Sequence, residues 1–421
     1  MIKISIIGLG YVGLPLAHAF SKKYKVVGYD INKDRIDELN RGFDRTQELT
    51  QKEVEASIKN GMKYTLNIED IKDSNIYIIT VPTPIDKSNE PDLTPVIKST
   101  QTVAKVLKKD DIVIYESTVY PGVTEEVCVP ILEKFSELKF NESFFCGYSP
   151  ERINPGDKEH TVTKILKITS GSTPEIAKKV DDLYKSIITA GTYLAPSIKV
   201  AEAAKVIENT QRDVNIALIN ELAMMFDVMN IDTHAVIEAA ATKWNFIKLT
   251  PGLVGGHCIG VDPYYLTHKA QSLGYMPNLI LGARQINNGM SKHIADKAIK
   301  FMVKNDKKLK GANILIMGVT FKENCPDMRN SKVLDIIKEL QEYECVVEVY
   351  DYWVDKSDKE TKPLRFIDEL PFDSQKYDAI IVAVGHDKFK EITAKQYESM
   401  SRGEMIVLDV KGIVEKPTWR L

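Results

Sequence analysis

The sequence predicts an α/β fold with two doubly wound, Rossmann-like parallel-sheet domains joined by a central helical dimerisation module. Apolar runs alternate with helical periodicity in the first third of the chain and again in the last third. Runs without polar alternation are typical of parallel strands that are covered on both faces. Two long helical stretches lie between these regions, so we expect domains at residues 1–195, 196–304 and 305–421.

Composition excludes several classes of function. The 421 residues include 56 Lys and Arg against 59 Asp and Glu, so no excess of positive charge is present to bind nucleic acid. Five scattered cysteines without a CxxC pair argue against a disulfide framework or a zinc ribbon, and they predict a reducing, cytoplasmic location. The uncharged run 4–21 resembles a secretory signal or a short membrane span, but its three glycines and Pro15 favour a strand-to-helix turn. We therefore expect no membrane association.

The first third of the chain begins with a strand, a glycine-rich turn and a helix at Tyr11–Phe20. Strands are expected at five apolar runs: Ile2–Ile7, Lys25–Tyr29, Ile76–Val81, Ile112–Tyr115 and Phe144–Gly147.

The glycine-rich turn contains the motif Gly8-Leu9-Gly10-Tyr11-Val12-Gly13. Gly8 permits the tight turn, Gly10 lets the backbone approach a pyrophosphate, and Gly13 allows the helix to pack closely on the strand. Asp30 ends the next strand, seventeen residues after Gly13, where its carboxylate would accept hydrogen bonds from a ribose. The motif predicts NAD as the cofactor. Arg35 could bridge to the cofactor, which leaves NADP as the alternative.

Two later strand ends are expected at the same crevice, because ligands of doubly wound sheets bind beyond the carboxyl ends of the strands. Pro82 and Thr83 follow one strand, and Ser117 and Thr118 follow the next. These residues predict a wall for the nicotinamide half of the cofactor, with plain turn residues as the alternative.

The middle of the chain has the pattern of two long helices, at residues 196–230 and at Asn278–Lys304. Lys205 and Asn209 are four residues apart and so lie on one face of the first helix. Taken alone, Lys205 has the ordinary interpretation of a solvent-exposed lysine.

A glycine-rich loop at residues 251–265 contains Cys258. Such a loop lets the backbone approach a ligand and holds the cysteine in a tight turn. The adjacent His257 has no further ligands at zinc-like spacing, so we expect no metal. A nucleophilic thiol is the favoured interpretation, and a small buried cysteine is the alternative.

Six sequence blocks in this order resemble the UDP-glucose/GDP-mannose dehydrogenase family over essentially the whole chain. They are Gly8–Gly13 with Leu14-Pro15, Glu116-Ser117-Thr118, Ser149-Pro150-Glu151-Arg152, Glu202–Lys205 with Asn209-Thr210, Gly255–Cys258 and Gly318–Lys322.

The resemblance implies oxidation of a primary alcohol at sugar C6 to a carboxylate in two hydride transfers, with two NAD per turnover. The Cys258 thiolate would add to the intermediate aldehyde, and the resulting thioester would be hydrolysed by water. Lys205 would stabilise the developing alkoxide, and Asn209 would donate a hydrogen bond to the same oxygen. Asp262 would organise a water together with Thr118. Glu151 would act as the base for thioester hydrolysis.

The blocks are similar to the UDP-N-acetylhexosamine branch of the family, since no lysine directly precedes Asp262. The order of expected substrates is UDP-GlcNAc, UDP-GalNAc and then UDP-ManNAc or UDP-glucose, and the product would serve surface polysaccharide biosynthesis. The first two sugars differ only in C4 configuration, which the sequence does not resolve.

The last third is expected to form strands at Asn313–Met317, Val346–Tyr350, Ala379–Val384 and Met405–Val410, with a helix at Lys332–Glu342. Its first turn lacks a Gly-x-Gly-x-x-Gly motif, so a mononucleotide is more plausible than a second dinucleotide. The resemblance implies that the UDP group binds there, in a homodimer. It also implies substrate contacts from these residues: Glu151, Arg152, Lys205, Asn209, Gly255, Arg284, Phe321, Lys322 and Arg329.

Two other functions are alternatives. A simpler dehydrogenase would stop at the aldehyde or ketone, and Cys258 together with a third domain argues against it. A non-catalytic nucleotide-sugar-binding protein would be expected to lack Lys205 or Cys258, and both are present.

Overall fold

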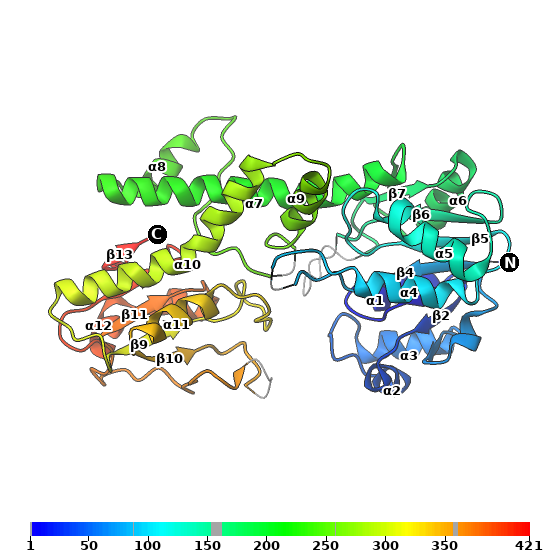
Figure 1. Ribbon diagram of the computed structural model, residues 1–421. Coiled ribbons are helices and arrows are strands. Elements are labelled where there is room, and N and C mark those ends of the chain that lie inside the picture. Colours follow the sequence, from blue (N-terminus) through cyan, green and yellow to red (C-terminus); the bar gives the residue numbers. More distant parts are fainter. Residues whose placement is uncertain (1, 87, 153–161, 257, 357–360) are drawn as a thin grey trace. The chain divides into compact units, whose positions relative to one another are not determined.

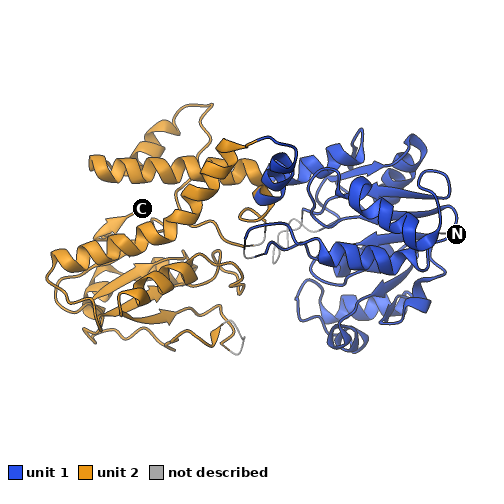
Figure 2. Ribbon diagram, in the orientation of Figure 1, with its two compact units in different colours: residues 1–208, 264–275 blue, residues 209–263, 276–421 orange. Residues whose placement is uncertain are grey.

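The computed structural model describes residues 2–86, 88–152, 162–256, 258–356 and 361–421, and it divides into two compact units (Figure 2). The first unit comprises Met1–Glu208 with Tyr264–Tyr275, and the second comprises Asn209–Pro263 with Met276–Leu421. The division falls within the long helix α7, Ile198–Met229, which contributes to both units. The boundaries of three domains at residues 195 and 304 stay a prediction.

The first unit contains an eight-stranded sheet in the order β3-β2-β1-β4-β5-β6-β7-β8 (Figure 1). Every neighbouring pair is parallel except β6 and β7, which are antiparallel. The strands are β1 Lys3–Ile7, β2 Lys25–Tyr29, β3 Lys63–Thr65, β4 Ile76–Ile79, β5 Asp111–Tyr115, β6 Phe144–Tyr148, β7 Lys167–Gly171 and β8 Thr192–Leu194.

Helices cover both faces of this sheet, as the uniformly apolar strands predict. Ile4 and Ile6 of β1 face one apolar cluster, and Ile7 faces another on the opposite side. Side-chain caps begin three of the helices, for example Thr50, which forms a reciprocal capping box with Glu53. The helices are α1 Gly13–Ser21, α2 Lys33–Asn40, α3 Gln51–Lys59, α4 Thr94–Ala104, α5 Val129–Ser136 and α6 Pro174–Lys185, with a 3₁₀ helix at Ile68–Ile71 and a π-helical segment at Val123–Cys128.

The second unit contains a five-stranded, wholly parallel sheet in the order β10-β9-β11-β12-β13. Ile314 and Ile316 of β9 pack with helices α10 and α11, whereas Leu315 and Met317 face the cluster that contains α12. The strands are β9 Asn313–Met317, β10 Val346–Tyr350, β11 Ala379–Val382, β12 Val407–Asp409 and β13 Trp419–Arg420. The helices are α8 Thr233–Ala240, α10 Asn278–Lys304, α11 Val333–Glu342 and α12 Ala394–Met400, with a 3₁₀ helix at Asp387–Glu391.

The predicted parallel-sheet fold and central helices are confirmed. Helix α9, Asp262–Ser272, was not predicted, and neither were β3, β7, β8 and β13. The antiparallel direction of β7 is the main departure from the expected topology. Among the described residues, no helix is both long and apolar enough to cross a membrane.

Candidate active site

The glycine-rich turn lies between β1 and α1, as predicted. Gly8 has φ +94°, and its N–H donates to the Tyr29 carbonyl at 2.8 Å. A Cβ on Gly13 would lie 1.9 Å from the Gly8 carbonyl oxygen, so only glycine fits there. A Cβ on Gly10 would meet nothing within 4 Å, which leaves its backbone open to a ligand. Tyr11 and Val12 are half-buried within the same turn.

Asp30 braces this turn from the end of β2. Its Oδ2 accepts from the Leu9 N–H at 2.8 Å, and its Oδ1 accepts from the Asn32 N–H at 2.9 Å. The carboxylate is half-buried and stands where the ribose of a dinucleotide is expected, so the residues present fit NAD.

Arg35 is placed differently from the expected bridge to the cofactor. Its side chain is buried, and Nε donates to the Leu9 carbonyl at 2.7 Å. Nη1 pairs with Asp44 at 2.7 Å and also with Glu38. Because these partners engage the guanidinium, Arg35 stabilises the glycine turn through the Leu9 carbonyl and is not available to the cofactor.

The two strand ends that were expected beside the nicotinamide are joined by a hydrogen bond. Ser117 Oγ donates to the Val81 carbonyl at 2.7 Å, which links the residues after β5 to those after β4. Thr83 and Thr118 are half-buried, and Pro82 is exposed.

Lys205 lies on the part of α7 that belongs to the first unit, and its exposed fraction is only 6%. Its ammonium group has no hydrogen-bond or ion-pair partner among the described residues. Burying an ammonium without a partner is costly, so this lysine is a strong candidate for a functional cation. Arg152 donates to the Lys205 carbonyl at 3.3 Å and to the Ala204 carbonyl at 2.9 Å, and it also pairs with Glu208.

In the second unit, the structure brings together two residues expected in catalysis. Asn209 Nδ2 donates to Asp262 Oδ2 at 2.6 Å, and both side chains are buried. Val261 and Asp262 donate their N–H groups to the Cys258 carbonyl, which forms the expected tight turn. The Cys258 side chain is exposed, whereas the other four cysteines are buried. His257 lies outside the described residues.

Packing requires two glycines of the cysteine loop, while the predicted approach of its backbone to a ligand stays a prediction. A Cβ on Gly255 would lie 2.8 Å from the Asn330 carbonyl oxygen. Gly256 has φ +81°, and a Cβ there would lie 2.9 Å from the Phe321 ring. The loop therefore needs these glycines to pack against the turn that follows β9.

The turn after β9 contains Phe321, Lys322 and Arg329, whose contacts with a nucleotide sugar stay a prediction. Lys322 borders a small surface pocket together with Ser331, Lys332 and Lys411. Arg329 pairs with Asp327 through Nε at 3.0 Å and Nη2 at 2.6 Å, which orients the loop.

Arg284 is buried rather than displayed at a surface. Its Nη1 donates to Asp213 at 2.6 Å, and a Cβ on Gly260 would lie 3.9 Å from its guanidinium. Within this chain it joins α10 to α7 and borders the cysteine loop. The resemblance to the family implies that this arginine contacts substrate, often across a dimer interface, and that contact stays a prediction.

Comparison with known proteins decides the family. Three domain models of the UDP-glucose/GDP-mannose dehydrogenase family match the chain. The NAD binding domain matches residues 2–188, the central domain matches residues 199–289, and the UDP binding domain matches residues 315–416. The chain belongs to the UDP-glucose/GDP-mannose dehydrogenase family. It is therefore an NAD-dependent nucleotide-sugar dehydrogenase, which confirms the predicted enzyme class and cofactor.

Two relatives and one solved structure illustrate the match. The chain is 56% identical over 418 residues to UDP-N-acetyl-D-glucosamine 6-dehydrogenase of Pseudomonas aeruginosa, covering 99% of this chain and 98% of the relative. It is 54% identical to the enzyme of the same name from Salmonella typhi, covering 98% and 96%. The solved UDP-D-ManNAc dehydrogenase of Pyrococcus horikoshii has a TM-score of 0.88 and 32% identity, covering 100% and 98%.

The dehydrogenase also contains a buried polar cluster that the sequence analysis missed. Lys167 Nζ lies 2.7 Å from both Glu116 Oε2 and Glu151 Oε2, and the Tyr184 hydroxyl donates to Glu116. Burial raises the pKa of Glu116, although the Lys167 ammonium opposes this. Burial lowers the pKa of Lys167, but the two carboxylates outweigh it and raise that pKa above its usual value. Glu116 and Glu151 follow neighbouring strands, and two buried acids so placed need a cation between them. This is the sequence signal that could have predicted a buried lysine here.

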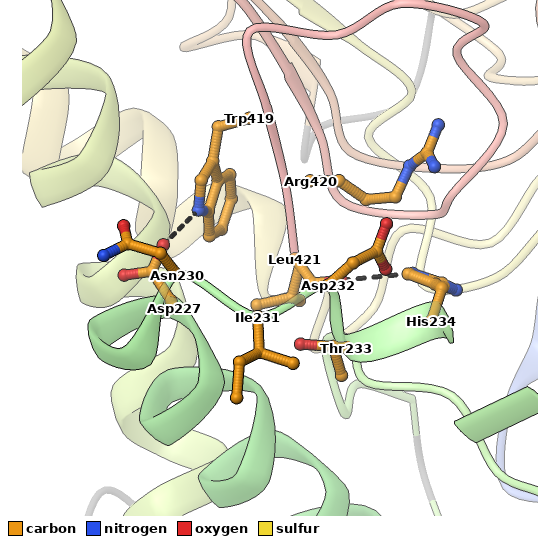
Figure 3. Close-up of a pocket in the computed structure, with 9 residues that line it drawn as sticks. All are labelled: Asp227, Asn230, Ile231, Asp232, Thr233, His234, Trp419, Arg420 and Leu421. Carbon is orange, nitrogen blue, oxygen red and sulfur yellow. Dashed lines mark hydrogen bonds between the residues drawn. The ribbon is translucent and has the colours of Figure 1, made fainter. Parts of the chain in front are cut away.

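A cavity of about 220 Å³ lies elsewhere in the second unit, between the α7–α8 junction and β13 (Figure 3). Trp419 Nε1 donates to Asp227 at 2.7 Å, and His234 Nε2 lies 3.1 Å from the Leu421 carbonyl oxygen. None of the predicted site residues lines this cavity. Across the described part of the chain, no cluster of His, Cys, Asp and Glu could hold a metal ion.

Proposed function

We propose that this dehydrogenase oxidises the C6 hydroxyl of UDP-N-acetylglucosamine to a carboxylate, in four electrons overall, for surface polysaccharide biosynthesis. The observation that carries the proposal is the 56% identity to the Pseudomonas aeruginosa enzyme named for that substrate. Identity to the UDP-D-ManNAc dehydrogenase structure is only 32%. UDP-GalNAc stays the second candidate, because one hydrogen bond at C4 can decide between the two sugars.

The alcohol is activated by residues of α7. The glycine turn and Asp30 would hold NAD, which when bound would supply the hydride acceptor for both oxidations. The buried ammonium of Lys205, which has no partner among the described residues, stabilises negative charge on the C6 oxygen as its proton leaves. Asn209 donates to the same oxygen, and its hydrogen bond to Asp262 fixes the direction of the amide. Asp262 and Thr118 organise the water that takes up the proton.

Cys258 makes the second oxidation possible. Its thiolate forms a C–S bond to the aldehyde carbon, and the carbonyl oxygen becomes an alkoxide next to Lys205. Loss of a hydride from that carbon leaves a thioester. Water then attacks the thioester carbon, Glu151 takes a proton from the water, and the C–S bond breaks to release the carboxylic acid and the cysteine thiolate. The exposed position of Cys258 in its tight turn suits this role.

The UDP group is held by the turn after β9. Lys322 and Lys332 border its pocket and offer positive charge to a diphosphate. Phe321 and Gly255 pack together there, so the nucleotide turn also supports the cysteine loop. Arg152 and Arg284 act mainly by fixing α7, since their guanidinium groups bond to groups on that helix.

We further propose a cytoplasmic homodimer. Large apolar side chains are exposed on the central helices and on the loop after α8: Leu218, Met225, Val228, Trp244, Ile247 and Leu279. Trp244 is 97% exposed, which suits a surface that a second copy covers. A reducing compartment keeps the Cys258 thiol available. Sedimentation velocity tests the proposal, and a monomer at micromolar concentration contradicts it.

The substrate is tested by initial rates with UDP-GlcNAc, UDP-GalNAc, UDP-ManNAc and UDP-glucose. The proposal requires the highest kcat/KM for UDP-GlcNAc, and a higher value for another sugar overturns it. A Cys258→Ala variant tests the chemistry separately. It is expected to bind UDP-GlcNAc but form no net acid, and acid formation would refute the nucleophile assignment.

A further inference from the structure

The reversal of one strand creates the buried cluster in the first unit. In the antiparallel pair β6–β7, Tyr148 lies opposite Ser170. Continuing that register places Glu151 opposite Lys167, at the start of β7. Glu116 follows the neighbouring strand β5, where Tyr115 pairs with Tyr148. The sheet thus brings one lysine from an antiparallel strand to two acids at the carboxyl ends of parallel strands.

Contacts on every side fix the Lys167 ammonium. It lies 2.7 Å from one oxygen of each acid and 5.4 Å from the centre of the Tyr184 ring. Tyr184 also donates to the second oxygen of Glu116. All four side chains are buried, so these interactions are little screened by solvent.

Glu151 is the member of the cluster that the proposed reaction uses. Its Oε1 accepts from the Arg152 N–H at 2.6 Å, and its Oε2 accepts from Lys167. Each oxygen of the carboxylate therefore has a donor, and together these two hydrogen bonds hold its plane in place. Glu116 competes for the same ammonium and adds a second negative charge nearby.

We infer that Lys167 is a positioning residue for thioester hydrolysis, which holds the Glu151 carboxylate in place beside a compensating positive charge, with Glu116 and Tyr184 anchoring the lysine from the other side. The inference rests on the proposed function of Glu151 as the base. It assigns Lys167 to the hydrolysis step alone, after both hydride transfers. In that step Glu151 gains the proton of the attacking water, and the ammonium remains protonated throughout.

The test is rapid-mixing kinetics of Lys167→Met on whichever UDP-hexosamine the wild type oxidises. The variant is expected to form two NADH per chain in a fast first turnover at a nearly wild-type rate. Steady-state turnover is then expected to be about 10- to 100-fold slower, because the base is misplaced. Intact mass spectrometry is expected to show an acyl group accumulating on Cys258.

Two further variants show whether Lys167 acts through its positive charge or only by filling space in the cluster. Lys167→Arg keeps the charge and is expected to restore most of the turnover. Glu116→Gln removes the competing charge, so the acidic limb of the turnover–pH profile is expected to move to lower pH. The same limb is expected to move to higher pH in Lys167→Met, because the cation that lies 2.7 Å from the Glu151 carboxylate is lost. Within the described residues, the titratable and charged groups that face Glu151 in this cluster are those of Glu116, Lys167 and Tyr184, and the Arg152 N–H donates to it.

Lys164→Met is the matched control, since Lys164 is exposed three residues earlier in the chain. It is expected to behave as wild type. If Lys167→Met slows the first two NADH equally, or no acyl group accumulates, the inference is wrong. If Lys167→Met fails to fold, the pH shift of Glu116→Gln decides, and an unchanged profile overturns the inference. A wild type that yields two NADH with UDP-GlcNAc supports the proposed function whatever these variants do.

Discussion

The first turns of the two parallel sheets share one hydrogen-bonded frame. Gly8 and Gly318 both have positive φ, and each donates its N–H to the last residue of the neighbouring strand, at 2.8 and 2.9 Å. The next N–H in each turn donates to an aspartate just beyond that strand, from Leu9 to Asp30 and from Val319 to Asp351, both at 2.8 Å. The frame itself therefore carries no information about the ligand.

The turns differ in what surrounds the aspartate. Asp30 is half-buried, whereas Asp351 is 2% exposed and its Oδ2 lies 3.2 Å from His386 Nε2. The first turn continues with the open Gly10 and the tightly packed Gly13. The second continues through Thr320, Phe321 and Lys322. A dinucleotide turn thus needs an accessible acid and two further glycines, whereas the covered acid of the second turn only holds that turn together.

The largest effect is expected from Gly13→Ala. The new Cβ would overlap the Gly8 carbonyl oxygen and lie 2.4 Å from Thr80 Oγ1, so the first turn must deform. We expect a loss of about 3 kcal/mol in the free energy of unfolding, together with loss of NAD binding. Urea unfolding and NAD titration measure both. Wild-type stability with intact NAD binding would contradict the proposed packing.

The two aspartates are expected to separate binding from stability. Asp351→Asn removes a buried partner of Val319 and His386, and should lower the free energy of unfolding by about 1–3 kcal/mol. Asp30→Asn should instead raise the KM for NAD about tenfold or more, through the lost ribose contact. Each variant is the control for the other. If Asp30→Asn and Asp351→Asn raised the KM for NAD equally, the two aspartates would not differ in function as the account requires.

Gly10→Ala is expected to affect the cofactor alone. Nothing in the protein lies within 4 Å of the added methyl group, so the melting temperature should stay within about 1 °C of wild type. The KM for NAD should rise several-fold, because the methyl group meets the bound pyrophosphate. A large drop in melting temperature would show that the backbone at Gly10 is packed.

The smallest effect concerns acid stability. Burial opposes ionisation of Asp351, but hydrogen bonds from His386 and from the Val319 N–H hold the pKa of Asp351 below its usual value. A lowered folded-state pKa contributes stability above the unfolded-state pKa, and this is lost as the pH falls through the folded-state value. Asp351→Asn should therefore flatten the fall in unfolding free energy below about pH 4. If the unfolding free energy of the variant fell at low pH as steeply as that of the wild type, Asp351 would not be the source of this acid sensitivity.

Much of the fold could be predicted, because buried parallel strands are read directly from apolar runs. The predicted ranges of β2, β9, β10 and α10 coincide with those in the structure. The short edge strands β3, β8 and β13 have two or three residues, too few for a pattern to show. The antiparallel direction of β7 was not predicted, because strand direction depends on the path of the connection between β6 and β7 and not on the residues of the strand itself.

The candidate site likewise contains residues that the sequence could predict and residues that it could not. Gly13, Asp30 and Cys258 stand in local motifs whose spacing predicts their surroundings. The partners of Arg35 and Arg284 come from other elements, so the sequence could not tell a ligand-binding arginine from a paired structural one. Lys167 was missed for the same reason, since its acids are 51 and 16 residues away.

One measurement tests the central claim most directly, that a single dinucleotide turn and Cys258 together support a four-electron oxidation. It is the NADH yield at completion, with limiting UDP-GlcNAc and excess NAD. The account predicts two NADH for each UDP-GlcNAc consumed. A yield of one NADH would mean that the reaction stops at the aldehyde, and it would contradict the function assigned to Cys258.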